Sequence, residues 1–386
     1  MKVVFMNASF SGNVHEMIDA SLIGMLSSHF DVYSYAQESR IPCLQNTIRP
    51  LWNSDTILWN NFKNGSIKGI FNALKVCLRE VRVIFKHKKD NPIYIISFLN
   101  GISANIINLI CILTKIRVVF IAHNDLECIN KKKNRINGFK NYLLYLFYTK
   151  MPLGRNLRIM VLGDSILSNV SHYIKQGRMR HFFSFDHPYF SSLQPFDGIP
   201  FLKKKNIDIG LVGRMDTRPS RGFANLCDFA NTVSSDSSIK IHIISSIDKC
   251  LLNLLPTNII VRQESDCVLS RNEYDNEIKK MDYLLIPYHQ DFYKLTASGA
   301  VFEAIVNNKP ALMYSTDYFT YLSKKFGNFG IFVDTLNKEQ LLIKLHDQKQ
   351  YIELINEQKK ILQEINPLNM SSSFCSLIET LWNTNK

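Results

Sequence analysis

Three arginines and two glycines within ten residues form the first candidate site. The segment from Gly213 to Gly222 reads Gly-Arg-Met-Asp-Thr-Arg-Pro-Ser-Arg-Gly and follows the strand-like run 207–212. A guanidinium stays charged at physiological pH and donates paired hydrogen bonds to phosphate oxygens. Arg214 and Arg221 could therefore stabilise a diphosphate on which negative charge develops. The alternative is an ordinary solvated basic loop.

A second candidate site lies in residues 283–310. The apolar run 283–286 predicts a buried strand that ends at a proline, a polar loop with Tyr288 follows, and Ser298-Gly299 begins a helix. Ser is a favourable N-cap residue, Gly admits a ligand close to the backbone, and helix N-termini attract anions. Glu303, one turn into the helix, could accept hydrogen bonds from sugar hydroxyls. It could equally be an ordinary surface carboxylate.

The first half of the chain has further candidates where predicted strands end. The first apolar strand is followed by Gly12 and Asn13, and a later one ends at His123 and Asn124. Ligands of open parallel sheets bind at the carboxyl ends of the strands. His123 is therefore a candidate catalytic residue, with a buried structural histidine as the alternative. His15 is expected to be a capping or surface residue.

The elements that would position these residues predict an α/β fold. Apolar strands alternate with helical segments, and 386 residues are enough for two hydrophobic cores. We expect a first domain at 1–185, an irregular linker at 186–205, a second domain at 206–370 and a closing helix within 371–386. The closing helix could return to the first domain, after Pro367 ends the helix before it.

The order of motifs in the second domain resembles the donor-binding half of GT-B glycosyltransferases, enzymes with two Rossmann-like domains and an interdomain cleft. The segments that carry the resemblance are Gly213-Arg214, Arg221-Gly222, Glu303-Ala304 and Asn308-Lys309-Pro310. Many retaining members have a Glu eight positions before the second Glu, where this chain has Leu295. This departure leaves the stereochemistry of transfer open.

The resemblance assigns roles to the candidate residues. It implies a site for a nucleotide sugar that involves Gly213, Arg214, Arg221, Tyr288, Ser298, Gly299 and Glu303. It implies catalytic roles for His123, Arg214 and Arg221, and acceptor-side positions for Gly12, Asn13 and Asn124. The chain contains no Asp-x-Asp, so neither a catalytic metal nor another cofactor is expected.

Positive charge is concentrated in the first half of the chain. Residues 1–185 contain 24 Lys and Arg against 10 Asp and Glu, a net charge of +14, whereas the remaining residues carry −1. In 63–90 and 131–150 the basic residues stand beside aliphatic and aromatic ones, which suits an anionic membrane surface. The alternative is an apolar core beneath a solvated basic face. No nucleic-acid-binding motif is present, so nucleic acid is not an expected partner.

The sequence also bears on localisation. Residues 93–113 carry no charge and are long enough to span a membrane, but their Asn, Ser and Gly residues favour a strand, a loop and a helix instead. The N-terminus lacks a signal-like run, and none of the eight cysteines forms a C-x-x-C pair, which argues against a zinc site and a disulfide framework. We therefore expect a cytoplasmic protein, peripheral on the inner face of the cytoplasmic membrane.

Together these features predict a glycosyltransferase. It would move a sugar from a nucleoside-diphosphate sugar to a lipid-linked or polysaccharide acceptor during assembly of a surface glycan such as O-antigen, capsule or lipopolysaccharide. One alternative is a nucleotide-sugar epimerase of the same fold. The other is a non-enzymatic basic protein that binds membranes or nucleic acid, which would explain the +14 half but not the motifs of the second half.

Overall fold

The structure, a computed structural model, describes residues 1–9, 15–63, 69–130, 138–189, 206–262, 269 and 271–382. The chain forms two compact units. The first unit comprises Met1–Ser192, Leu295–Ala297 and Ile365–Lys386, and the second comprises Leu193–Lys294 and Ser298–Glu364. The second unit thus ends at Glu364, before the expected limit at 370. Most of the expected linker, 190–205, lies outside the described residues.

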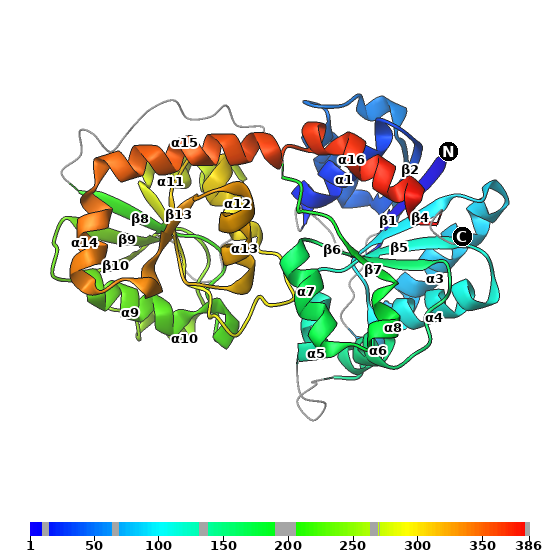
Figure 1. Ribbon diagram of the computed structural model, residues 1–386, viewed down its shortest axis with the longest axis horizontal. Helices are drawn as coiled ribbons and strands as arrows, with labels where there is room; N and C mark the ends of the chain where they lie inside the picture. Colours follow the sequence, from blue (N-terminus) through cyan, green and yellow to red (C-terminus); the bar gives the residue numbers. More distant parts are fainter. Residues whose placement is uncertain are drawn as a thin grey trace. The chain divides into compact units, whose positions relative to one another are not determined.

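The first unit is built on a parallel sheet of seven described strands in the order β3-β2-β1-β4-β5-β6-β7 (Figure 1). Its strands β4 and β5 are buried along almost their whole length, as expected for a sheet covered on both faces. The strands are β1 (Lys2–Asn7), β2 (Asp31–Gln37), β3 (Leu58–Phe62), β4 (Ile93–Ser97), β5 (Arg117–Ile121), β6 (Leu157–Val161) and β7 (Phe182–Ser184).

Helices cover both faces of this sheet. Right-handed crossovers between parallel strands place α3, α4 and α6 on one face and α1 on the other, where α16 packs against it (Figure 1). The described helices of this unit are α1 (Glu16–Ser27), α2 (Ile41–Ile48), α3 (Ile70–His87), α4 (Gly101–Leu113), α5 (Glu127–Asn130), α6 (Phe139–Thr149), α7 (Asp164–Tyr173), α8 (Gln176–Met179) and α16 (Pro367–Thr380).

The second unit contains a parallel sheet of six described strands in the order β10-β9-β8-β11-β12-β13. The strands are β8 (Ile207–Leu211), β9 (Ile239–Ile243), β10 (Ile259–Val261), β11 (Tyr283–Ile286), β12 (Ala311–Met313) and β13 (Gly330–Phe332). Around it lie α9 (Phe223–Val233), α10 (Lys249–Leu252), α11 (Arg271–Lys280), α12 (Gly299–Val306), α13 (Asp317–Phe326), α14 (Lys338–His346) and α15 (Gln348–Glu364). Its core contains Ile and Leu from β8 and β9 and the apolar side chains of α9.

The predicted α/β architecture with two parallel sheets is confirmed. The uncharged run 93–113 forms β4, a short turn and α4, and every described helix is too short or too polar to cross a bilayer. Strands β2 and β3 were not predicted from the sequence. The segment 58–62, Leu-Trp-Asn-Asn-Phe, gives too weak an alternation of apolar and polar residues.

The closing helix begins earlier than expected. Pro367 lies in the first turn of α16. Backbone N–H groups of a first turn have no acceptor within the helix, so the missing N–H of proline costs no helical hydrogen bond there. The Asn366 side chain caps this helix by accepting a hydrogen bond from the backbone N–H of Leu368. Within the first unit, α16 packs on α1, and Ser371 Oγ lies 3.2 Å from Met25 O.

Candidate functional site

In the second unit, the strand order reverses direction at β8. This strand pairs with β9 on one side and with β11 on the other, so the loops after β8 and β11 leave neighbouring strands at the same edge of the sheet. Such a reversal point is where open α/β sheets bind ligands. The predicted arginine segment follows β8, and the predicted helix N-terminus follows β11. The fold therefore brings together two motifs about seventy residues apart in the sequence.

The two loops are in direct backbone contact. Gly222 adopts φ +71°, and a Cβ atom added there would lie 1.6 Å from the carbonyl oxygen of Pro287. Only glycine fits this position, because it tolerates positive φ and has no side chain to clash. Asn225 Nδ2 donates to the same oxygen at 3.1 Å. The loops after β8 and β11 are thereby held in a fixed register.

Asp216 organises the arginines of the first loop. Its carboxylate accepts hydrogen bonds from the backbone N–H of Arg218 at 3.0 Å and from Arg218 Nε at 2.8 Å, and these bonds hold the pKa of Asp216 below its ordinary value. Arg221 Nε lies 3.8 Å from the same carboxylate. Arg214 is exposed and pairs with Asp248 at 2.8 Å. Three arginines against two aspartates leave the cluster with a net positive charge.

Two stacked tyrosines line the second loop. The rings of Tyr288 and Tyr293 are 4.2 Å apart and nearly parallel. Tyr293 takes a left-handed backbone conformation, φ +59°, which is unfavourable for an aromatic residue and is therefore a candidate functional feature. Its hydroxyl lies 3.4 Å from Arg221 Nη1. Gly213 is also close, since a Cβ there would lie 3.1 Å from the Tyr288 hydroxyl.

The N-terminus of α12 differs from the expected cap. Ser298 holds the N-cap position, but its side chain makes no capping hydrogen bond, and its buried Oγ has no hydrogen-bond partner among the described residues. Gly299 is exposed, and a Cβ added to it would meet no atom within 4 Å. Glu303 is half-buried one turn further on. This helix end thus offers amides, an unpaired hydroxyl and open space above them.

In the Asn308-Lys309-Pro310 segment, the lysine side chain is buried in the protein. Lys309 is 1 % exposed, and its Nζ donates to the carbonyl oxygens of Lys279 at 3.1 Å and Met281 at 2.5 Å. Lys309, which precedes β12, therefore connects to the backbone at and just after the end of α11. Asn308 takes φ +50° at the turn. The sequence alone did not indicate that the lysine points inward.

In the first unit, a buried polar cluster lies at the carboxyl edge of the sheet. Asp19, from α1, accepts hydrogen bonds from Asn7 Nδ2 at 2.7 Å, Arg40 Nη2 at 2.7 Å and Ser97 Oγ at 2.5 Å. Asp19 and Arg40 are fully buried, so their ion pair is shielded from solvent. Arg40 Nε and Nη1 have no hydrogen-bond partner among the described residues. A buried guanidinium with unused donors is unusual and costly.

His123 adjoins this cluster, and its tautomer follows from its neighbours. Ser97 Oγ donates its proton to Asp19, so His123 Nε2, at 3.2 Å from Ser97 Oγ, must donate to that oxygen. Nδ1 is then unprotonated and can accept a hydrogen bond or a proton. The backbone N–H of His123 donates to Asp125 Oδ1 at 2.7 Å, which fixes the turn after β5.

A second histidine lies against His123. The ring centroids of His15 and His123 are 4.8 Å apart with the ring planes tilted by 41°, and His15 is the exposed N-cap residue of α1. Burial, together with the neighbouring His15 and His187, holds the pKa of His123 well below its ordinary value. Burial also lowers the pKa of His187 to about 4. The His123 imidazole is consequently neutral at physiological pH.

The remaining acceptor-side candidates are only partly described. Gly12 and Asn13 lie outside the described residues, and Asn124 is exposed at the turn after β5. The sequence missed Asp19, Ser97 and Arg40. No local motif marks these residues: Asp19 lies in α1, Ser97 is the last residue of β4, and Arg40 follows β2.

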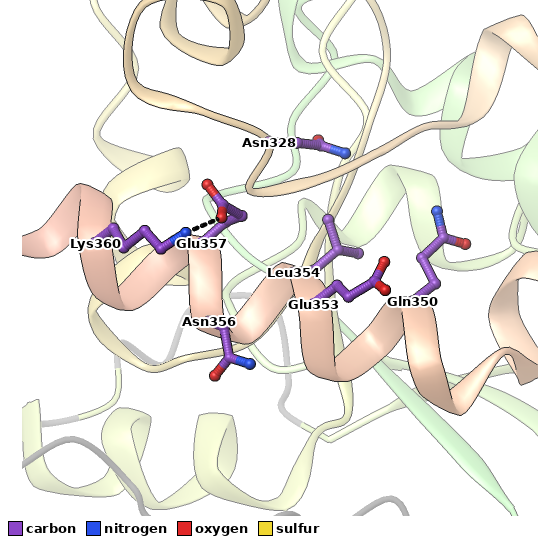
Figure 2. A pocket seen from close by; sticks show the side chains of 7 residues that line it. All are labelled: Asn328, Gln350, Glu353, Leu354, Asn356, Glu357 and Lys360. Atoms are coloured by element: carbon purple, nitrogen blue, oxygen red, sulfur yellow. Dashed lines mark hydrogen bonds and ion pairs between the residues drawn. The ribbon is translucent and has the colours of Figure 1, made fainter.

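A surface hollow elsewhere in the second unit does not match the candidate site. It has a volume of about 450 Å³ and runs along α15. Figure 2 shows Glu353 and Glu357 on successive turns, with Lys360 paired to Glu357 at 2.5 Å. Its carboxylates would repel a diphosphate, and none of the predicted site residues lines it. Among the residues that the structure describes, no three His, Cys, Asp or Glu side chains gather as metal ligands would.

Comparison with solved structures identifies the fold. No family model matches the sequence, and no curated protein matches it either. Among solved structures, the chain is similar to Anabaena HepE (Alr3699) in complex with UDP-glucose, with a TM-score of 0.65 at 11% identity over 98% of this chain and 100% of that chain.

Two further structures are similar over nearly their whole length. WaaG, described as a glycosyltransferase involved in lipopolysaccharide biosynthesis, has a TM-score of 0.60 at 13% identity over 98% of this chain and 99% of its own. A putative UDP-N-acetylglucosamine 2-epimerase from Listeria monocytogenes has a TM-score of 0.53 at 14% identity over 100% and 97%. At such identities the likeness concerns the fold, and the chain has the GT-B glycosyltransferase fold.

Proposed function

We propose that the protein is a glycosyltransferase that moves a sugar from a nucleoside-diphosphate sugar to a lipid-linked or polysaccharide acceptor in surface-glycan assembly. The observation that supports this most is the meeting of the arginine segment and the α12 N-terminus at adjacent strands β8 and β11. Cationic donors from one loop and free amides from the other are the groups that a diphosphate requires.

The second unit would bind the donor. The diphosphate would lie over Gly299, where there is open space, and accept hydrogen bonds from the α12 amides and Ser298 Oγ. Arg221 and Arg214 would stabilise the charge that develops on it, and Arg214 would exchange Asp248 for phosphate. Glu303 would bind hydroxyls of the nucleotide sugar. In this proposal no metal ion is needed for the leaving group.

The chemistry is a substitution at the anomeric carbon. The bond between that carbon and the diphosphate oxygen breaks, the diphosphate leaves with the electron pair, and an acceptor hydroxyl oxygen forms the new bond. The acceptor proton must then be taken up by a base. The neutral imidazole of His123, with Nδ1 unprotonated, has the protonation state for this role.

The acceptor and the setting are inferred from charge and from the resemblance. The excess of +14 in residues 1–185 suits an acceptor with a pyrophosphate group and an anionic membrane surface. We place the protein on the inner face of the cytoplasmic membrane, as a peripheral protein. The similarity in fold to WaaG supports a lipopolysaccharide-type pathway.

An epimerase is the second candidate function. The Listeria structure described as a putative epimerase is similar in fold over nearly the whole chain. An epimerase would bind the same kind of nucleotide sugar, but it would convert it without an acceptor. Nucleotide release that depends on added glycan acceptor favours transfer, whereas conversion of the nucleotide sugar alone favours epimerisation.

A thermal-shift screen against UDP, GDP, TDP, CMP and their sugars tests the donor site. A ligand that binds only the folded protein at 100 times its Kd adds about 2.7 kcal/mol to the free energy of unfolding. We expect one nucleotide to raise the Tm, and Arg221→Ala and Glu303→Ala each to remove most of that rise.

The matched controls are Lys338→Ala and Glu339→Ala, which remove exposed charges from α14 of the same unit and should leave the rise intact. A folded protein whose Tm responds to none of these ligands would contradict the proposal and favour a basic binding protein. Retention of the full rise in Arg221→Ala and Glu303→Ala would place the nucleotide elsewhere.

A further inference from the structure

Helix α3 is apolar on two opposite faces, and the protein covers only one of them. Toward the core, Ala73 and Cys77 pack against Ile102 of α4. Toward solvent, Phe71 is 82% exposed, and other large side chains follow it at helical spacing. The exposed apolar residues of this helix are Ile70, Phe71, Leu74, Leu78 and Phe85. A soluble surface rarely presents such a continuous stripe.

Helix α4 continues this surface. It lies beside α3 on the same face of the sheet (Figure 1). It contains no charged residue, and Leu113 near its end is 73% exposed. Its exposed apolar residues are Ile106, Leu109, Ile112 and Leu113. We call these four, together with the five exposed apolar residues of α3, the α3–α4 face.

The charges at the border of the α3–α4 face are of one sign. The basic residues are Lys75, Arg82, Lys86, Lys88 and Lys89, all exposed. The one acidic residue of α3, Glu80, is buried between the two helices and does not reach the surface. The next acid along the chain, Asp90, is paired with Lys2 at 3.0 Å. The face therefore combines bare apolar side chains with uncompensated positive charge.

We propose that the α3–α4 face docks on an anionic lipid bilayer. The helices lie along the membrane surface, the apolar side chains enter the boundary between headgroups and acyl chains, and the basic side chains contact lipid phosphates. This is a binding activity of the first unit, and it stands whether or not the second unit transfers a sugar. None of the residues involved belongs to the candidate catalytic cluster.

The combination of charge and apolar surface favours an anionic bilayer over a second copy of the chain or a nucleic acid. A second copy of the chain would bring the same face against itself in a two-fold dimer, so that basic residues would oppose basic residues. A nucleic acid would neutralise the charge but leave the apolar side chains in water. A bilayer with anionic headgroups satisfies both the apolar stripe and the basic border.

The test is co-sedimentation of the full-length protein with vesicles. We expect it to pellet with phosphatidylcholine vesicles that contain phosphatidylglycerol, to remain in solution with phosphatidylcholine alone, and to be released by salt. The double variant Phe71→Asp/Leu113→Asp should lower partitioning by about tenfold or more, because it places charge in the apolar boundary. Lys75→Glu/Arg82→Glu should weaken binding to the anionic vesicles, because it reverses charges that contact lipid phosphates.

Matched controls place the same changes outside the face. Ile343→Asp alters an apolar residue of α14 that is 64% exposed, and Lys338→Glu/Lys349→Glu reverses two exposed charges in the second unit. Both control proteins should bind as the parent does, and thermal unfolding should confirm that every variant is folded. Absence of binding to anionic vesicles at low salt would overturn the proposal, and so would equal losses in the controls. Light scattering that shows a dimer converted to a monomer by Phe71→Asp/Leu113→Asp would assign the face to a second copy.

Discussion

At the residue scale, a chain of hydrogen bonds controls the protonation of His123. Asp19 accepts from Ser97, and Ser97 in turn accepts from His123 Nε2. Asp19 is held in place by Asn7 and Arg40, so the orientation of the imidazole depends on side chains from several elements. Ser97 does not face the reaction in this arrangement. It is a positioning residue for His123.

Replacing Ser97 with Ala tests this assignment. The variant removes the oxygen that accepts from Nε2, so the imidazole can adopt the other tautomer. We expect kcat for nucleotide release to fall by about 100-fold, within the usual range for general-base catalysis, with KM changed little. Ser97→Thr, which retains a hydroxyl, should restore much of the rate. An unchanged kcat in a folded Ser97→Ala protein would show that the tautomer is not controlled in this way.

At the scale of elements, the contact between α3 and α4 contains a buried carboxyl group. Glu80 is 1% exposed, it interacts with Ser103 of α4, and its Oε2 has no hydrogen-bond partner among the described residues. Burial raises the pKa of Glu80 from 4.5 to about 7, and it raises the pKa of the neighbouring Cys77 thiol to about 11. Glu80 is therefore protonated in the folded protein over a pH range in which it is ionised in the unfolded chain.

The stability contribution of Glu80 follows from this shift. Because the pKa is higher in the folded state, the free energy of unfolding decreases as pH rises from about 4.5 to 7. The full effect is about 3 kcal/mol. Glu80→Gln should remove this pH dependence. The free energy of unfolding of the variant, relative to that of the parent, should therefore be higher at pH 8 than at pH 5. Urea unfolding of parent and variant at both pH values measures it, with exposed Glu339→Gln as the control. Parallel pH dependence in parent and Glu80→Gln would contradict the prediction.

At the scale of the whole molecule, the last helix belongs to the first unit although it follows the second in sequence. Phe374 is fully buried, and its ring lies 4.7 Å from Phe185. Cys375 and Ile378 are also buried. The chain thus returns, after the residues of the second unit, to complete the core of the first unit.

Phe374→Ala should destabilise the first unit selectively. Loss of a buried phenylalanine side chain typically costs about 3–5 kcal/mol. The three tryptophans, Trp52, Trp59 and Trp382, all belong to the first unit, so tryptophan fluorescence reports its unfolding. We expect a lower fluorescence midpoint in urea, while the nucleotide that raises the Tm of the parent still binds at low urea. An unchanged midpoint would mean that α16 contributes little to this core.

Much of the second unit could be predicted because its signals are local. The apolar run Tyr283–Ile286 forms β11, and the helix expected to begin at Ser298-Gly299 forms α12 at Gly299. The relation of the motifs to the ligand was less predictable. Lys309 lies in a segment that resembles a ligand-binding motif, yet it holds two backbone carbonyls inside the protein. Ser298 occupies the N-cap position without making the cap.

The sequence by itself determined the fold class, the second-unit motifs and the concentration of positive charge in the first half. These are properties of composition and short-range periodicity, which neighbouring residues carry. Only the tertiary structure decided which groups pair. It placed Asp216 among the arginines, Ser97 between Asp19 and His123, and the uncovered apolar stripes of α3 and α4 side by side. Pairing depends on residues distant in sequence, and a protonation state or an exposed face is fixed only when the chain has folded.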